Sequence, residues 1–211
     1  MVYGEELNAE SINARRKVAR EAATLLYFGL EKEYKQAKLK AAENLRVHIL
    51  PTNLEVALEL DCVAEENEGP SRNQRLVRMR MEALKIMHCL EAYNPVLIGS
   101  VWRGTIRRGS DIDISVYHDV PEEIVNLLKT NNVNIARTAQ TAVNKQGKTL
   151  QSFHIYAETD QGDQIEIVIR AAEEKGEKRR CETFGDYMKG LRIQELEKVL
   201  EQNPTQRFIP T

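Results

Sequence analysis

The stretch that decides the fold is Leu97–Ile114, LIGSVWRGTIRRGSDIDI, in which an apolar run ends in Gly-Ser and a later run carries two aspartates. Side chains alternate between the faces of a β-strand, so Asp111 and Asp113 are expected to share one face while the isoleucines beside them enter a core. Two carboxylates at one spot repel each other, and a divalent cation relieves that repulsion. Magnesium is the expected ion, because it prefers carboxylate and phosphate oxygens.

The Gly-Ser pair is predicted to hold phosphate. Gly99 allows the backbone to approach a ligand closely, because it has no side chain. Ser100 adds a hydroxyl where a helix is expected to begin, and the free N–H groups at a helix start bind phosphate. The predicted metal and phosphate sites therefore face each other.

The segment GSVWRGTIRRGSDIDI resembles the signature of the DNA polymerase β-type nucleotidyltransferase superfamily, in which Gly-Ser, a short helix and Asp-x-Asp between apolar residues follow one another. Ten residues separate Ser100 from Asp111, which is similar to the spacing of the minimal nucleotidyltransferases, including those paired with helical toxins. Gly104-Thr105 also resembles the GT of archaeal CCA-adding enzymes. The resemblance implies a mixed α/β fold whose sheet spans residues 85–170.

The resemblance also implies a reaction. Asp111 and Asp113 would bind two Mg²⁺ ions, with Mn²⁺ as the alternative, that bridge the phosphates of an NTP such as ATP. An acceptor oxygen would attack the α-phosphate in line and release pyrophosphate. Gly99, Ser100 and Arg103 would hold the β and γ phosphates.

Two further assignments follow from the same resemblance. Ser110, just before the first aspartate, is a candidate for nucleotide binding. A third carboxylate is expected on a later strand, and Glu166 in QIEIVI is the candidate, although aspartate is commoner there. It would bind the metal next to the attacking hydroxyl or act as the base. Asp163 and Glu158 are the alternatives for this role.

Other residues of the segment have a structural interpretation beside the functional one. Arg103 can cover the sheet edge, and Trp102 is expected to pack between helix and sheet rather than stack on a base. The histidines show no ligand spacing and are assigned no role; they are His48, His88, His118 and His154.

The pattern is helical from about residue 9 to residue 91. Pro51 interrupts it, and Thr52 with Glu55 forms a capping-box signature for the next helix. Gly69-Pro70 separates that helix from another, which has an apolar stripe from Leu76 to Leu90. These helices would pack internally or across a homodimer.

Strands and two further helices are expected after residue 95. The strand candidates are 96–98, 112–116, 133–143, 149–157 and 164–169, with hairpin loops at Gln146-Gly147 and Gln161-Gly162-Asp163. A helix is expected from Pro121, and a final helix is expected to contain Phe184, Met188, Leu191, Leu196 and Val199. We therefore predict an α/β (α+β) fold with a helical region at 1–90, a catalytic domain at 91–180 and a C-terminal helix and tail at 181–211.

Composition restricts the class of protein. The 211 residues are 42% hydrophobic and 29% charged, with a formal charge of −2. Neither a membrane span nor a signal peptide is readable, so a cytoplasmic protein with no membrane partner is expected. The scattered cysteines Cys62, Cys89 and Cys181 form no zinc or disulfide pattern.

The acceptor is left open by the sequence. Arg72, Arg75 and Arg78 could form a basic ridge that guides RNA or a tRNA-like end, or a solvated face with no such role. A near-neutral charge and short length favour a protein or small-molecule acceptor instead. A third hypothesis is a non-catalytic, antitoxin-like binding module that keeps the fold.

Overall fold

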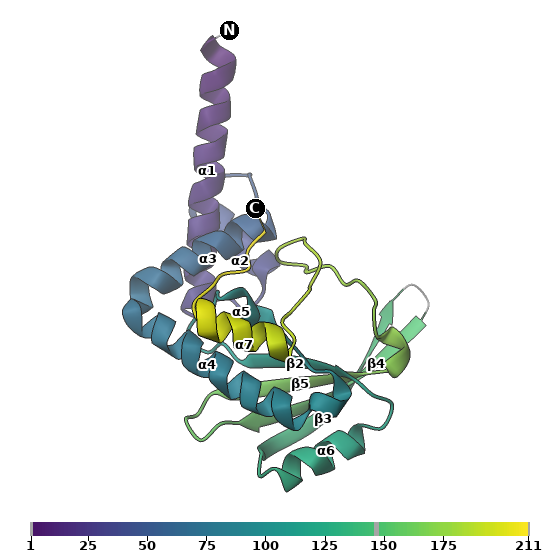
Figure 1. Ribbon diagram of the computed structural model, residues 1–211. Helices are drawn as coiled ribbons and strands as arrows, with labels where there is room; N and C mark the ends of the chain where they lie inside the picture. Colours follow the sequence, from purple (N-terminus) through teal and green to yellow (C-terminus); the bar gives the residue numbers. More distant parts are fainter. Residues whose placement is uncertain (1, 146–147, 211) are drawn as a thin grey trace. The chain divides into compact units, whose positions relative to one another are not determined.

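A computed structural model describes residues 2–145 and 148–210, which form two compact units (Figure 1). Among the described residues, the first unit comprises 2–70, 180–186 and 210, and the second comprises 71–179 and 187–209. No helix within this described part combines the length and the hydrophobicity that crossing a bilayer requires.

The first unit is helical, as expected. Its helices are α1 (Val2–Tyr27), α2 (Tyr34–Asn44) and α3 (Asn53–Glu68), and their small apolar residues, such as Ala22 and Ala41, form a core of their own. The capping box is confirmed: Glu55 N donates to Thr52 Oγ1 at 3.2 Å, and Thr52 N donates to Glu55 Oε2 at 2.6 Å. These bonds satisfy N–H groups that a helix start leaves without partners.

The second unit contains a five-stranded mixed sheet in the order β1-β2-β5-β4-β3. Strands β2 and β5 are parallel, and the other neighbours are antiparallel. The strands are β1 (Val96–Ile98), β2 (Ile112–Tyr117), β3 (Asn134–Lys145), β4 (Lys148–Glu158) and β5 (Gln164–Arg170). The helical segments are α4 (Pro70–Cys89), η1 (Glu91–Tyr93), α5 (Gly99–Arg103), α6 (Pro121–Thr130), η2 (Ala172–Glu174) and α7 (Ile193–Gln202).

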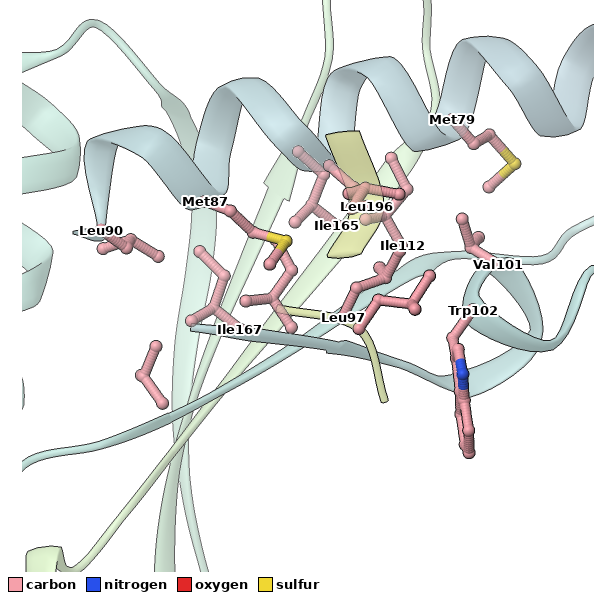
Figure 2. Packing of buried hydrophobic residues seen from close by; sticks show 14 of the residues in the cluster. Met79, Met87, Leu90, Leu97, Val101, Trp102, Ile112, Ile165, Ile167 and Leu196 are labelled. Atoms are coloured by element: carbon pink, nitrogen blue, oxygen red, sulfur yellow. The ribbon is translucent and has the colours of Figure 1, made fainter. Parts of the chain in front are cut away.

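The mixed α/β fold and the predicted strands are confirmed within a few residues at their ends. The loop expected at Gln146-Gly147 lies outside the described residues. The second compact unit begins at residue 71 and includes most of α4, because the apolar stripe of α4 packs in the core of the sheet. Figure 2 shows Met87 of α4 near Ile167 and Met79 of α4 near Val101, all within this buried core.

The helices α4, α6 and α7 all contribute to this one core, so they cover one face of the sheet. Figure 1 shows α4 and α7 running alongside each other over the strands, and His88 Nε2 of α4 lies 3.3 Å from Glu197 Oε1 of α7. The opposite face carries the polar side chains of β2, β4 and β5, since side chains alternate along each strand.

The expected extent of the final helix was wrong. It begins at Ile193, so Phe184, Met188 and Leu191 precede it. Leu191 instead pairs antiparallel with Leu97 beside β1. Gly190 makes this approach possible: its φ is +67°, and a Cβ there would lie 2.6 Å from the Leu97 carbonyl oxygen.

Candidate functional site

The pairing of β2 with β5 brings three carboxylates together. Asp113 on β2 is opposite Glu166 on the parallel strand β5, and Asp111 comes just before β2. One carboxylate oxygen from each residue lies within 4.8 Å of the other two. All three side chains are partly buried rather than fully exposed to solvent.

The alternation expected along β2 explains this placement. Ile112, Ile114 and Val116 are fully buried in the core, so the residues between them face the opposite side of the sheet. The same rule places Glu166 on that side, because Ile165 and Ile167 are buried beside the isoleucines of β2. The site therefore lies on the face that α4, α6 and α7 leave uncovered.

Gly99 lies directly against Asp113. Ile98, at the end of β1, pairs with Asp113 across the sheet, and the chain turns there into α5 with Gly99 at φ +71°. A Cβ on residue 99 would lie 1.9 Å from Asp113 Oδ2, which is far inside van der Waals contact. Only glycine allows this backbone to pass so close to the carboxylate. Ser100 follows it in the first turn of α5.

The surrounding protein neutralises the negative charge of the cluster only in part. Burial, the charge of Asp111 and the charge of Glu166 together raise the pKa of Asp113 to about 7. Burial and Glu166 raise the pKa of Asp111 as well, whereas Arg107 lowers it. Converging carboxylate oxygens that repel one another fit a hard divalent cation such as Mg²⁺.

His154, which sequence reasoning assigned no role, contacts the third carboxylate. Its Nδ1 lies 2.7 Å from Glu166 Oε1. An ionised carboxylate only accepts hydrogen bonds, so Nδ1 is the donor. The side chain of Tyr156 also bonds Glu166, which raises the pKa of the Tyr156 hydroxyl, and the Arg137 guanidinium lies 3.5 Å from the centre of the Tyr156 ring.

Two hydroxyls support the other side of the His154 ring. Thr141 Oγ1 and Ser152 Oγ both lie 2.9 Å from His154 Nε2 and 2.8 Å from each other. The ring is thus held from both nitrogens. The signal for this network was present in the sequence, because Ser152, His154 and Tyr156 alternate with buried residues on β4, opposite the strand that carries Glu166.

Arg103 lies in a buried environment. Its side chain is 3% exposed, its Nη1 donates to Phe208 O at 3.0 Å, and its guanidinium stacks on Trp102, 4.4 Å from the ring centre. Trp102 is buried and also stacks on Phe208, in agreement with its structural interpretation. Ser110 Oγ accepts a hydrogen bond from Arg107 N at 2.9 Å and thereby closes the turn before Asp111.

The alternatives for the third carboxylate lie apart from the cluster. Asp163 accepts two hydrogen bonds from Arg78, at 2.9 and 2.8 Å. Glu158 is exposed at the end of β4. Neither belongs to the group that Asp111, Asp113 and Glu166 form.

The basic ridge considered for α4 does not form as a solvent-facing row. Arg72 is 2% exposed, and its Nε donates to Ile106 O at 2.7 Å. Arg78 is held by Asp163. A spacing of three residues places side chains near one another on a helix, but here Arg72 and Arg78 make contacts within the second unit.

The family model described as "Nucleotidyltransferase domain" matches residues 80–198. No curated protein matches the sequence.

Several solved structures are similar to part of this chain. A cytoplasmic RNA terminal U-transferase is 17% identical, with a TM-score of 0.34, over 46% of this chain and 29% of its own. The Cid1 poly(U) polymerase bound to MgATP is 15% identical, with a TM-score of 0.30, over 45% of this chain and 32% of its own. The structure of the GLD-2/RNP-8 complex is 14% identical, with a TM-score of 0.32, over 57% of this chain and 44% of its own. The chain thus spans less than half the length of each.

Proposed function

This chain belongs to the nucleotidyltransferase domain family, and from that premise we propose that it is a magnesium-dependent enzyme that transfers an NMP from an NTP to an acceptor and releases pyrophosphate. The observation that carries the proposal is the convergence of Asp111, Asp113 and Glu166 within 4.8 Å on the uncovered face of the sheet. Gly99 against Asp113 supports it, because a residue without a side chain brings the backbone at the start of α5 directly against the carboxylate.

Asp111, Asp113 and Glu166 are the residues proposed to hold two magnesium ions, which would supply charge stabilisation for the entering and leaving oxygens when bound. Gly99 and Ser100 are proposed to hold the NTP phosphates. Ser110 is proposed to lie beside the bound nucleotide, because its side chain closes the turn that leads into Asp111. Arg103 would need to leave its bonds with Phe208 and Trp102 to reach a phosphate, so we propose that it supports α5 instead.

The proposed reaction uses Glu166 as the residue that takes the proton. The acceptor oxygen forms a bond to the α-phosphorus, and the bond from this phosphorus to the bridging oxygen of the β-phosphate breaks. Pyrophosphate leaves with the electron pair, and the acceptor hydroxyl proton passes to the Glu166 carboxylate. His154 is a positioning residue in this scheme, because its Nδ1 hydrogen bond fixes the direction of the carboxylate.

The test uses α-phosphate-labelled NTPs, Mg²⁺ and an extract of the source cells, with the wild-type protein and the Asp111→Asn/Asp113→Asn variant. We expect label to enter acceptor material with the wild type and not with the variant. Sensitivity of the product to RNase or to protease, or resistance to both, then identifies the acceptor class. Comparing ATP with the other NTPs identifies the donor.

Glu158→Gln/Asp160→Asn is the matched control, since it removes two carboxylates from exposed positions near the β4–β5 loop. It is expected to transfer label as the wild type does. If no NTP gives transfer above the level of the Asp111→Asn/Asp113→Asn variant, the catalytic proposal is wrong, and the non-catalytic binding module becomes the better description.

A further inference from the structure

A cavity of about 400 Å³ lies on the same face of the sheet as the carboxylates. Ser115 and Tyr117 of β2 line it, and they alternate along the strand with buried residues, just as Asp113 does. Arg170 of β5 also lines it, four residues beyond Glu166. At roughly 3.3 Å per residue, about 13 Å of strand separates these two positions. The cavity is therefore a neighbour of the candidate active site.

The cavity is strongly basic. Among the described residues that line it, six are basic and one, Glu177, is acidic; the basic residues are Arg170, Lys175, Lys178, Arg179, Lys189 and Arg192. The whole chain has a net charge of −2, so this concentration of positive charge is a local feature. A basic recess attracts an anionic ligand and raises its local concentration.

Two arginines of the wall carry positive charge that nearby carboxylates do not fully match. Arg179 Nη2 bonds Glu174 and lies 3.8 Å from Glu177 Oε2. Its Nε is nevertheless buried, with no hydrogen-bond acceptor in the described part of the protein. Burial and then the charge of Arg179 lower the pKa of Arg170. A phosphate oxygen in the cavity would add negative charge beside these two guanidinium groups.

An aromatic ring accompanies the positive charge. Tyr187 lines the cavity and is 46% exposed, and Lys178 Nζ lies 6.0 Å from the centre of its ring. Basic groups that follow a phosphate backbone, combined with an accessible ring on which a base can stack, are typical of single-strand binding. A free phosphate or a phosphorylated small molecule would use the arginines but would have no use for the ring.

We propose that this cavity binds the acceptor of the reaction, a single-stranded nucleic acid, with a backbone phosphate at Arg170 and Arg179 and a base on Tyr187. The nucleic acid would then lie along the sheet face that α4, α6 and α7 leave uncovered, and its terminal hydroxyl would lie at Glu166. This inference rests on the proposed function and identifies its acceptor class. It also replaces the α4 ridge with a different basic surface.

The experiment measures the binding of fluorescein-labelled RNA and DNA 12-mers of the same mixed sequence by fluorescence anisotropy, in EDTA and without NTP. Wild type is compared with Lys178→Gln/Lys189→Gln, which changes exposed cavity residues only. The control Lys129→Gln/Lys198→Gln removes the same charge from exposed positions on α6 and α7. Tyr187→Ala is compared with Tyr187→Phe, which keeps the stacking surface.

We expect the cavity double variant to bind about tenfold more weakly than wild type at 100 mM salt. The slope of log affinity against log salt should decrease by about 1.4, since each contact with a single-strand phosphate contributes about 0.7. Tyr187→Ala should also lose about tenfold in affinity, while Tyr187→Phe and the lysine control stay near wild type. Tighter binding of either 12-mer supports the proposal and shows whether the acceptor is RNA or DNA.

The proposal is overturned if wild type binds neither 12-mer at 50 mM salt, or if cavity and control variants lose affinity equally. It is also overturned if the cavity variants lose ATP affinity as strongly as 12-mer affinity, because the cavity would then belong to the NTP. Since these measurements need neither metal nor transfer, a failure of catalysis would leave their result readable.

Discussion

His154 Nδ1 lies 2.7 Å from Glu166 Oε1, so a histidine on β4 holds a carboxylate on β5 that faces Asp113 on β2. The bond crosses between antiparallel strands, whose positions are set by the whole backbone ladder. It therefore fixes the direction of the Glu166 carboxylate before any ligand binds. Such support is typical of residues behind metal-binding carboxylates.

Replacing His154 should reduce turnover more than substrate binding. For His154→Ala we expect kcat to fall by about 10- to 100-fold, with the KM for the NTP near the wild-type value, because the phosphate-binding segment is untouched. His154→Asn should recover part of kcat, since its amide can donate from a place near Nδ1. Steady-state kinetics and a Mg²⁺ titration check this, and an unchanged kcat in His154→Ala would contradict the positioning role.

Gly99→Ala should abolish most activity. The new Cβ would lie 1.9 Å from Asp113 Oδ2, so the carboxylate must move, and a displacement of this size near reacting atoms costs about 100-fold in rate. Gly109→Ala is the matched control, because Gly109 also has a positive φ, +77°, but nothing within 4 Å of its Cβ position.

Both alanine variants should lose about 1 kcal/mol of folding free energy from backbone strain, and only Gly99→Ala should lose transfer. Initial rates and urea unfolding curves for the two variants separate the effect of backbone strain from the effect of the contact between the new Cβ and Asp113. Equal activities of the two would show that Asp113 tolerates displacement.

Asp113→Asn should stabilise the metal-free protein while removing activity. The folded-state pKa of Asp113, about 7, is raised above the ordinary value of 3.8, so its contribution to stability is fully present below about pH 4 and is lost as pH rises through 7. The shift corresponds to at most about 4 kcal/mol. The neutral amide of the variant avoids this loss.

The measurement is the Tm of both proteins in EDTA between pH 4 and pH 8. The Tm of the variant should rise relative to that of the wild type as pH rises. Adding Mg²⁺ should raise the Tm of the wild type but not that of the variant. A difference in Tm that does not change with pH would argue against repulsion within the cluster.

Arg80→Leu should destabilise the second unit. The Arg80 side chain is fully buried, and burial lowers its pKa to about 10. Its guanidinium donates to four carbonyl oxygens at 2.7–3.1 Å, those of Val101, Trp102, Pro204 and Gln206. Removing the donor leaves these acceptors without that partner, at a cost of roughly 3 kcal/mol or more.

Urea unfolding compares Arg80→Leu with Lys129→Leu, which changes an exposed lysine on α6. Only the first should shift the unfolding midpoint strongly. Arg80→Lys should lie between them, because an ammonium group has fewer donors than a guanidinium. A midpoint for Arg80→Leu equal to that of the control would mean that Arg80 does not hold these segments together.

The final helix shows where local patterns mislead. Phe184, Met188 and Leu191 continue the helical spacing of Leu196, but the chain at Gly190 adopts a positive φ and pairs with β1. Backbone pairing with a distant strand outweighs local periodicity there. The same reason explains α4. Its apolar stripe was predicted, but the sequence did not predict that this stripe packs against the sheet rather than against the N-terminal helices.

The sequence by itself determined the strands and most of the helices, the pair of aspartates, and Glu166 as a candidate for the third carboxylate. Alternation at the start of β2 places Asp111 and Asp113 on one face, and the spacing from Ser100 to Asp111 identifies the motif, because both depend on neighbours within a short stretch of chain. Only the tertiary structure decided that Glu166 lies opposite Asp113, that His154 supports it, and that Arg103 and Arg72 are buried. These depend on which strands pair and in which register, and such contacts join residues far apart in the sequence, where no local period can report them.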